Sequence, residues 1–237
     1  EPPMWLFVLA GQSNMAGRGE VEAVDSTPHP RVFALKEDGS WGPAAEPLHW
    51  DKPNIVGVGP GFAFGRAMAE KYQDIRIGLI PTAVGGSSIR AWVPGGFHEQ
   101  TESHPWDDAL QRIQYVRVTT GGELKGIVWL QGESDSADYH DEYAAAIADL
   151  IARFRSELGE PDLPLVAGQI GAFYLDAHPG SETVNAAIAE LPEQVKNAGF
   201  VSAEGTVHKG DDVHFDSASA RTMGERYASE MEKLLGR

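Results

Sequence analysis

Short, nearly continuous apolar runs separated by helix-like stretches are the feature that most constrains the fold of this 237-residue chain. The runs cover residues 4–10, 75–80, 124–130 and 163–167. An apolar run of this length, bounded by turn signals, is typical of a strand that is buried on both faces in a parallel sheet. The sequence therefore predicts a sheet whose strands are covered from two sides.

Helical patterns fill the intervals between these runs. They are expected over residues 60–72, 106–116, 138–158, 180–191 and 217–235. In the stretch 138–158 apolar residues recur at spacings of three and four, and Gly159 follows as a stop signal. Strands that alternate with helices imply crossover connections between parallel strands. We predict a single α/β domain over residues 1–237, a three-layer α/β/α sandwich with a mostly parallel central sheet, and a long surface loop over residues 39–61.

Composition narrows the classes of partner. The formal net charge of -16 repels a phosphate backbone, and no Lys/Arg stripe reverses it, so nucleic acid is not an expected partner. The chain has no cysteine, which excludes disulfides, thiolate metal sites and a Cys nucleophile. No apolar run reaches the roughly 18 residues of a membrane span, and no membrane partner is expected.

The first residues, 1–4, lack the basic and apolar regions of a signal peptide. Because residue 1 is Glu and not Met, a secreted or periplasmic protein whose signal peptide has been removed and a trimmed chain would look the same here. The compartment and the oligomeric state stay open.

Polar motifs directly follow three of the predicted strands and precede the last helix. They occupy residues 11–17, 84–88, 131–135 and 211–216. In open α/β sheets the ligand site lies beyond the carboxyl ends of the strands. We therefore expect these four segments to meet around one cleft.

Ser13, His214 and Asp211 supply the residue types of a nucleophile, its general base and the acid that orients the base. Asp211 precedes His214 by three residues, a spacing that lets the carboxylate meet Nδ1 of the imidazole and leaves Nε2 free for the serine. The Ser13 segment departs from the Gly-x-Ser-x-Gly elbow of α/β-hydrolases because Met15 stands where the second Gly would be. The pattern favours a serine hydrolase on a different α/β scaffold.

The motifs in 11–17 (GQSNMAG), 85–87 (GGS), 129–135 (WLQGESD) and 211–214 (DDVH) together resemble the sialate O-acetylesterase and carbohydrate esterase family six branch of the SGNH hydrolases, which includes acetyl xylan esterases. They occur in the order of that family and span most of the chain. The resemblance implies a flavodoxin-like α/β/α fold, removal of O-acetyl groups from carbohydrates, and no metal or other cofactor.

The resemblance also implies roles for individual residues. Ser13 would be the nucleophile, His214 the general base and then the general acid, and Asp211 the residue that orients His214. The oxyanion hole would consist of the backbone N–H groups of Ser13 and Gly86 and the side-chain amide of Gln131. The wider SGNH group has Asn at this third position, and Gln keeps the amide donor one methylene further out.

Each of these residues also has a structural interpretation. Ser13 could cap the helix that follows the first strand. Asp211, Asp212, His214 and Asp216 together have the ligand types of a hard-metal site. Asp212 is the rival to Asp211 as the orienting acid.

Several other residues could contribute to the site or to the core. His208 is the one substitute base, Glu133 and Asp135 are expected to be structural hydrogen-bonding groups, and Arg90 either positions the substrate or pairs with an acid. Four tryptophans either line a sugar-binding cleft or pack in the core: Trp41, Trp50, Trp92 and Trp106.

The sequence thus predicts a metal-independent serine esterase that deacetylates a carbohydrate through an acetyl-serine intermediate. Acetylated xylan is preferred over sialic acid as the substrate because the chain is acidic. A lipid or aryl esterase on the same scaffold and a noncatalytic carbohydrate-binding protein remain the alternatives.

Overall fold

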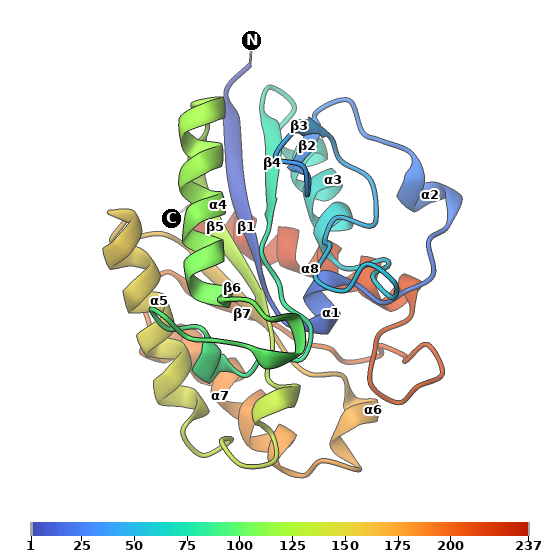
Figure 1. Cartoon of the computed structure of the whole chain (residues 1–237), viewed down its shortest axis with the longest axis vertical. Helices are drawn as coiled ribbons and strands as arrows, with labels where there is room; N and C mark the ends of the chain where they lie inside the picture. The colour runs from blue at the N-terminus through green and yellow to red at the C-terminus, as the bar shows by residue number, and fades with distance from the viewer. Residues whose placement is uncertain (1, 237) are drawn as a thin grey trace.

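The computed structural model describes residues 2–236 and is built around one seven-stranded sheet (Figure 1). The strands are β1 (Met4–Gly11), β2 (Val32–Leu35), β3 (Trp41–Pro43), β4 (Arg76–Pro81), β5 (Glu123–Leu130), β6 (Leu165–Gly168) and β7 (Ala198–Val201). Their order across the sheet is β3-β2-β4-β1-β5-β6-β7, and only β3 runs antiparallel to its neighbour. The carboxyl ends of β4, β1 and β5 therefore lie next to one another at the same edge.

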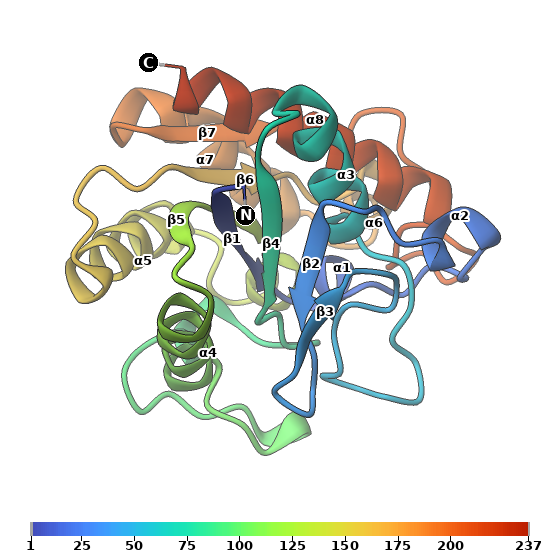
Figure 2. The same ribbon diagram turned by 90° about the horizontal axis from the view of Figure 1, so that it is seen from above.

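Helices cover both faces of the sheet (Figure 2). The longer ones are α3 (Gly61–Lys71), α4 (Pro105–Thr120), α5 (Tyr143–Leu158), α7 (Gly180–Gln194) and α8 (Ser217–Leu235). The short ones are α1 (Ser13–Ala16), α2 (Ala23–Ser26), α6 (Ala172–Leu175) and the 3-10 turns η1 (Ile89–Ala91), η2 (Glu99–Thr101) and η3 (Glu133–Asp135). No helix among residues 2–236 is both long enough and apolar enough to cross a membrane.

Strand β1 shows why its apolar run is continuous. Leu6 and Val8 belong to the core that includes α4, α5 and α7, whereas Phe7 and Leu9 belong to the core that includes α3 and α8. All four side chains are fully buried. A strand with a core on each side needs apolar residues at every position, which confirms the predicted three-layer α/β fold with a mostly parallel sheet.

The sequence did not predict β2, β3 or β7. β2 and β7 have four residues each, and β3 has three, of which two are Gly42 and Pro43. Pro cannot donate to a ladder, and β3 accommodates it because it is the edge strand. The predicted surface loop over residues 39–61 thus contains a strand, and it also buries Leu48, His49 and Val58. The predicted helix over 138–158 begins only at Tyr143, because turns occupy the preceding five residues.

The end of β1 lies so close to β5 that only glycine fits at position 11. Gly11 has a φ of 132°, and an added Cβ would collide with the carbonyl oxygen of Leu130. The next residue continues the contact, because the N–H of Gln12 donates to the same carbonyl at 2.9 Å. Gly11 therefore sets how closely the segment after β1 approaches the end of β5.

We expect Gly11→Ala to lower the free energy of unfolding by about 3 kcal/mol or more, because both the backbone conformation and the contact with Leu130 oppose a side chain. Gly121→Ala is the matched control. Gly121 also has a positive φ, 64°, but an added Cβ there meets no atom within 4 Å. Its cost should be roughly 1 kcal/mol. Urea unfolding of both variants measures the difference, and equal losses would contradict the role of the Leu130 contact.

Candidate active site

Four segments far apart in the sequence meet at the carboxyl ends of β4, β1 and β5. They are α1 after β1, the turn 82–88 after β4, η3 after β5, and the loop 202–216 that leads into α8. Figure 1 shows α1 at the end of β1. The order of the sheet thus brings the predicted polar motifs to one place.

Ser13, His214 and Asp211 form a hydrogen-bonded chain in this place. Nε2 of His214 lies 3.0 Å from Oγ of Ser13, and Nδ1 of His214 lies 2.7 Å from Oδ2 of Asp211. Because a carboxylate only accepts, Nδ1 carries the hydrogen and Nε2 is left to accept the proton of the serine hydroxyl. The other oxygen of Asp211 accepts the backbone N–H groups of Val213 and His214 at 3.0 and 2.8 Å, which fixes the loop around the carboxylate.

The surroundings of His214 favour its neutral form, which can accept a proton. Burial lowers the pKa of His214 below 6.5, although the carboxylate of Asp211 opposes this shift. Burial also acts to raise the pKa of Asp211, but the hydrogen bonds from His214 and Val213 outweigh it and lower that pKa to about 2. At neutral pH the imidazole is therefore neutral and the carboxylate is charged.

A cavity of about 250 Å³ opens over Ser13, and Gly86 and His214 also line it. The backbone N–H groups of Ser13 and Gly86 donate to no acceptor within residues 2–236. Gly86 has a φ of 83°, and an added Cβ there would clash with the side chain of Gln100. Two free N–H donors beside a serine hydroxyl are the elements of an oxyanion hole.

The structure does not bring Gln131 to this cavity. Gln131 is fully buried, and its amide nitrogen lies 3.2 Å from Oε1 of Gln12, 3.1 Å from the carbonyl of Ser87 and 2.5 Å from Oδ2 of Asp135. These three acceptors already exceed its two hydrogens. Its amide oxygen accepts the hydroxyl of Tyr143 at 3.0 Å. The expected role of the Gln131 amide as an oxyanion donor does not fit this arrangement.

Gln12 offers the free amide that Gln131 lacks. Its Oε1 accepts the N–H groups of Gly132 and Ser134 at 3.3 and 3.2 Å in addition to the amide of Gln131. Backbone N–H groups can only donate, so these contacts fix which end of the carboxamide is oxygen. Nε2 of Gln12 has no hydrogen-bond partner in the described part of the chain, and Gln12 lines the cavity. Sequence reasoning missed this residue although it stands next to Ser13.

Asn14 and Glu133 hold the histidine loop against the sheet. Nδ2 of Asn14 donates to Oε1 of Glu133 at 2.7 Å and to the carbonyl of Val213 at 3.1 Å, and its Oδ1 accepts the N–H of Phe215 at 3.0 Å. The two backbone groups flank His214. Burial raises the pKa of Glu133, and its Oε2 has no partner among residues 2–236. Glu133 lines the cavity over Ser13 and is joined to the histidine loop through Asn14.

A buried ion pair holds the turn that carries Gly86. Arg18 and Asp51 are both almost fully buried, and Nη2 of Arg18 lies 2.7 Å from Oδ2 of Asp51. The same oxygen accepts the N–H of Gly85 at 2.8 Å. No local pattern predicts this pair, because its members are 33 positions apart and Asp51 lies in the segment predicted to be a surface loop.

The alternative residues have partners elsewhere. Asp212 contacts His208 at 3.2 Å, and Asp216 caps α8 by accepting the N–H of Ser219 at 2.7 Å. Arg90 lies 3.0 Å from Asp138. The acidic groups around His214 therefore serve separate partners, and residues 2–236 contain no group of three or more His, Asp or Glu placed to hold a metal ion.

Asp135 has a structural role, because it accepts the side chain of Ser88 and the N–H of Ile89. Among the tryptophans, Trp92 and Trp106 are buried in the core, and Trp41 packs against it while partly buried. Trp50 stays half-buried at the surface. None of the four lines the cavity over Ser13.

The lowered pKa of His214 predicts the acid limb of the pH profile. With the neutral imidazole of His214 as the expected base, kcat/KM should stay high through neutral pH and fall only in the acid range, at a pH lower than the ordinary pKa of histidine. Asp211→Asn removes the charge that raises the pKa of His214, so the acid limb should move to lower pH while the rate falls by about 10⁴. A pH series with p-nitrophenyl acetate measures both effects.

Asp212→Asn is the matched control for this prediction, because Asp212 is the adjacent aspartate and its carboxylate faces His208. Its acid limb should coincide with that of the unmodified protein. If Asp212→Asn shifted the limb and Asp211→Asn did not, the orienting acid would be Asp212.

Comparisons with known proteins identify the family of the chain. The family model described as carbohydrate esterase, sialic acid-specific acetylesterase matches residues 3–233. A protein of Arabidopsis thaliana named as a probable carbohydrate esterase is 33% identical over 245 residues, which cover 94% of this chain and 88% of that protein. The X-ray structure of the Arabidopsis protein superposes with a TM-score of 0.84 at 31% identity and covers 100% of this chain and 99% of the other.

Two further relatives are more distant. Human sialate O-acetylesterase is 30% identical over 130 residues, which cover 46% of this chain and 24% of the human protein. The crystal structure of NanS has a TM-score of 0.76 at 18% identity and covers 100% of this chain and 98% of that one, a likeness that concerns the fold.

Proposed function

Because the chain belongs to the family of carbohydrate esterases described as sialic acid-specific acetylesterases, we propose that it removes O-acetyl groups from a glycan by attack of Ser13. Family membership makes the chain a carboxylic ester hydrolase and supports the esterase activity on carbohydrate. The observation that carries the serine mechanism is the chain of contacts from Ser13 through His214 to Asp211, with distances of 3.0 and 2.7 Å.

The first half of the proposed reaction forms an acetyl-enzyme. Oγ of Ser13 attacks the ester carbonyl while Nε2 of His214 takes the hydroxyl proton, and Asp211 stabilises the imidazolium that results. The carbonyl oxygen becomes an oxyanion, which the N–H groups of Ser13 and Gly86 bind. When the intermediate collapses, His214 gives the proton to the departing sugar oxygen, and the acetyl group stays on Ser13.

The second half releases acetate. A water molecule loses a proton to His214 and attacks the acetyl-serine carbonyl, the same donors hold the new oxyanion, and the proton returns to Oγ of Ser13 as acetate leaves. Every step uses residues of this chain, and no step requires a metal.

Two acetylated glycans are the candidate substrates. The net charge of -16 favours a neutral polymer, and acetylated xylan is the substrate that we propose on that ground. The family description favours O-acetylated sialic acid. Acetate release from the two substrates, compared by kcat/KM, decides between them.

Replacement of Ser13 tests the mechanism directly. We expect Ser13→Ala to lower the turnover of p-nitrophenyl acetate and of acetylated xylan by about 10⁴- to 10⁶-fold with little change in the free energy of unfolding. A serine-reactive organophosphate should label the unmodified protein at Ser13 and leave the variant unlabelled. Near-normal hydrolysis by Ser13→Ala would refute the serine mechanism and leave a noncatalytic role for the site.

Gln12 is the third donor that we propose for the oxyanion hole, with Gln131 as the residue that orients it. Gln12→Glu keeps an oxygen that accepts from Gly132 and Ser134 and replaces the free Nε2 by a second oxygen. We therefore expect kcat for p-nitrophenyl acetate to fall by about 100- to 1,000-fold while KM changes little. Gln114→Glu, on the exposed side of α4, is the control for added charge. A Gln12→Glu variant with normal kcat would remove Gln12 from the oxyanion hole.

A further inference from the structure

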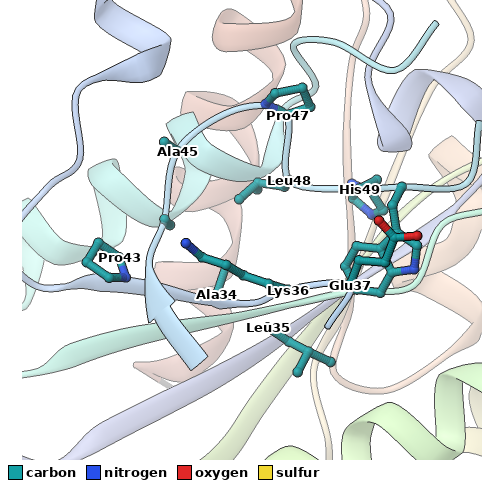
Figure 3. A pocket seen from close by; sticks show the side chains of 11 residues that line it. Ala34, Leu35, Lys36, Glu37, Pro43, Ala45, Pro47, Leu48 and His49 are labelled. Carbon is teal, nitrogen blue, oxygen red and sulfur yellow. The ribbon is translucent and has the colours of Figure 1, made fainter. Parts of the chain in front are cut away.

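A second hollow, of about 250 Å³, lies between the β2–β3 hairpin and the segment that follows β3 (Figure 3). Ala34 and Leu48 contribute apolar surface, Lys36 and Glu37 stand at the end of β2, and Trp50 lies in the wall. It shares no lining residue with the cavity over Ser13. The esterase mechanism uses none of these side chains.

A hollow of about 290 Å³ adjoins this one, and both are lined by Lys36, Glu37 and Trp50. The guanidinium of Arg112 lies 4.6 Å from the centre of the Trp50 ring and donates to the carbonyl of Pro81 at 2.9 Å. Arg112 lines the second hollow and not the first. The cation therefore stacks on the indole at the second hollow, and the same ring also lines the first hollow.

Tyr115 extends the aromatic surface along the second hollow. Its side chain is 47% exposed, and its hydroxyl donates to the carbonyl of Gly39 at 2.9 Å. The two hollows together form a groove, which we call the Trp50 groove, with one half-buried and one exposed aromatic ring. Both rings are held by hydrogen bonds or stacking, so little side-chain freedom would be lost on binding a ligand.

His49 adds a neutral polar group to the lining. Burial lowers the pKa of His49 to about 4, so the imidazole is uncharged at neutral pH. Nε2 lies 3.5 Å from the carbonyl of Leu9, and Nδ1 has no hydrogen-bond partner in the described chain. The lining thus combines aromatic surface with two cations, Lys36 and Arg112, one anion, Glu37, and one neutral acceptor, so the groove carries little net charge.

We propose that the Trp50 groove binds neutral pyranose units of a glycan, as a carbohydrate-binding site separate from the cavity over Ser13. An indole offers an apolar face for the C–H face of a sugar ring, and Lys36, Glu37 and His49 offer donors and acceptors for its hydroxyl groups. The hollows lie at the small end of ligand cavities, which suits one or two sugar rings.

The groove and the cavity lie on two sides of one short segment. Trp50 lines the groove, Asp51 holds Arg18 and Gly85, and Lys52 lines the cavity over Ser13. A polymer held by Trp50 would therefore stay close to the nucleophile. This use of the groove rests on the proposed esterase function, whereas binding of the sugar itself does not.

Unacetylated xylohexaose tests binding without turnover, because it contains no ester. Isothermal titration should show saturable binding in the millimolar range or tighter, and Trp50→Ala should weaken it by about tenfold or more. Trp5→Ala is the matched control, because Trp5 is also half-buried with a cation, Lys125, over its ring, at the other end of the strands. It should bind as the unmodified protein does. Absence of binding to the unmodified protein, or equal binding by Trp50→Ala, would overturn the proposal.

Activity measurements separate this proposal from the esterase assignment. Trp50→Ala should keep its kcat/KM for p-nitrophenyl acetate and lose about five- to tenfold in kcat/KM for polymeric acetylated xylan, since only the polymer reaches the groove. An equal loss on both substrates would overturn the role of the groove in polymer hydrolysis. If the unmodified protein hydrolysed neither substrate, the esterase proposal would fail, while the xylohexaose titration would still decide whether the groove binds sugar.

Discussion

The carboxamide of Gln12 is the point on which the arrangement of the site depends. Its oxygen accepts three N–H groups from residues 131–134, and these contacts join the segment after β1 to the segment after β5. The amide of Gln131 continues the network by donating to Asp135. Asp135 also accepts the N–H of Ile89 at 2.9 Å, and this contact connects the network to the segment after β4. Three loops of adjacent strands are thereby connected through buried groups.

Burial makes this hydrogen-bond network resist displacement of the three loops. A buried polar group without a partner costs about 1–3 kcal/mol, so a shift of one loop would leave several groups unsatisfied at once. The N–H groups of Ser13 and Gly86 lie on two of these loops and remain free. The protein therefore keeps two donors unpaired at the cavity while the groups behind them are paired, an arrangement that would preorganise the proposed oxyanion hole.

The histidine depends on a second connection, because its loop follows no strand of the active edge. Asn14 joins that loop to Glu133 through contacts to the backbone on both sides of His214. The charge on Asp211 holds the imidazole from the solvent side, and Ser13 meets it from the protein side. His214 is thus held by backbone, carboxylate and hydroxyl contacts, which explains how the proposed base keeps its position on an irregular loop.

The sequence predicted those parts whose cause is local. β1, β4 and β5 are apolar at almost every position because both faces are buried, and Asp211 and His214 meet within one turn of chain. The edge strand β3 could not be predicted, since Gly42 and Pro43 oppose a strand and only the pairing with β2 forms it.

The Gln12 and Gln131 amides show the same limit at the site. Both residues lie at strand ends in polar motifs. Only the tertiary hydrogen bonds determine which amide nitrogen is already hydrogen-bonded and which is free.

The net charge of the chain and the charges at the cavity act on a ligand in different ways. The net charge of -16 acts over distances at which salt screens it, about 8–10 Å at physiological ionic strength. Inside the cavity the cation Arg18 is compensated by Asp51, and burial raises the pKa of Glu133 and so disfavours its charge.

Lys52 also lines the cavity, and its ammonium donates to the neutral amide of Gln100 at 2.8 Å. The long-range field therefore disfavours the approach of an anionic glycan, whereas the cation at the cavity favours a carboxylate that has arrived. Net charge thus affects the rate at which a glycan reaches the protein. The choice between a neutral and an acidic sugar depends on Lys52 and its neighbours.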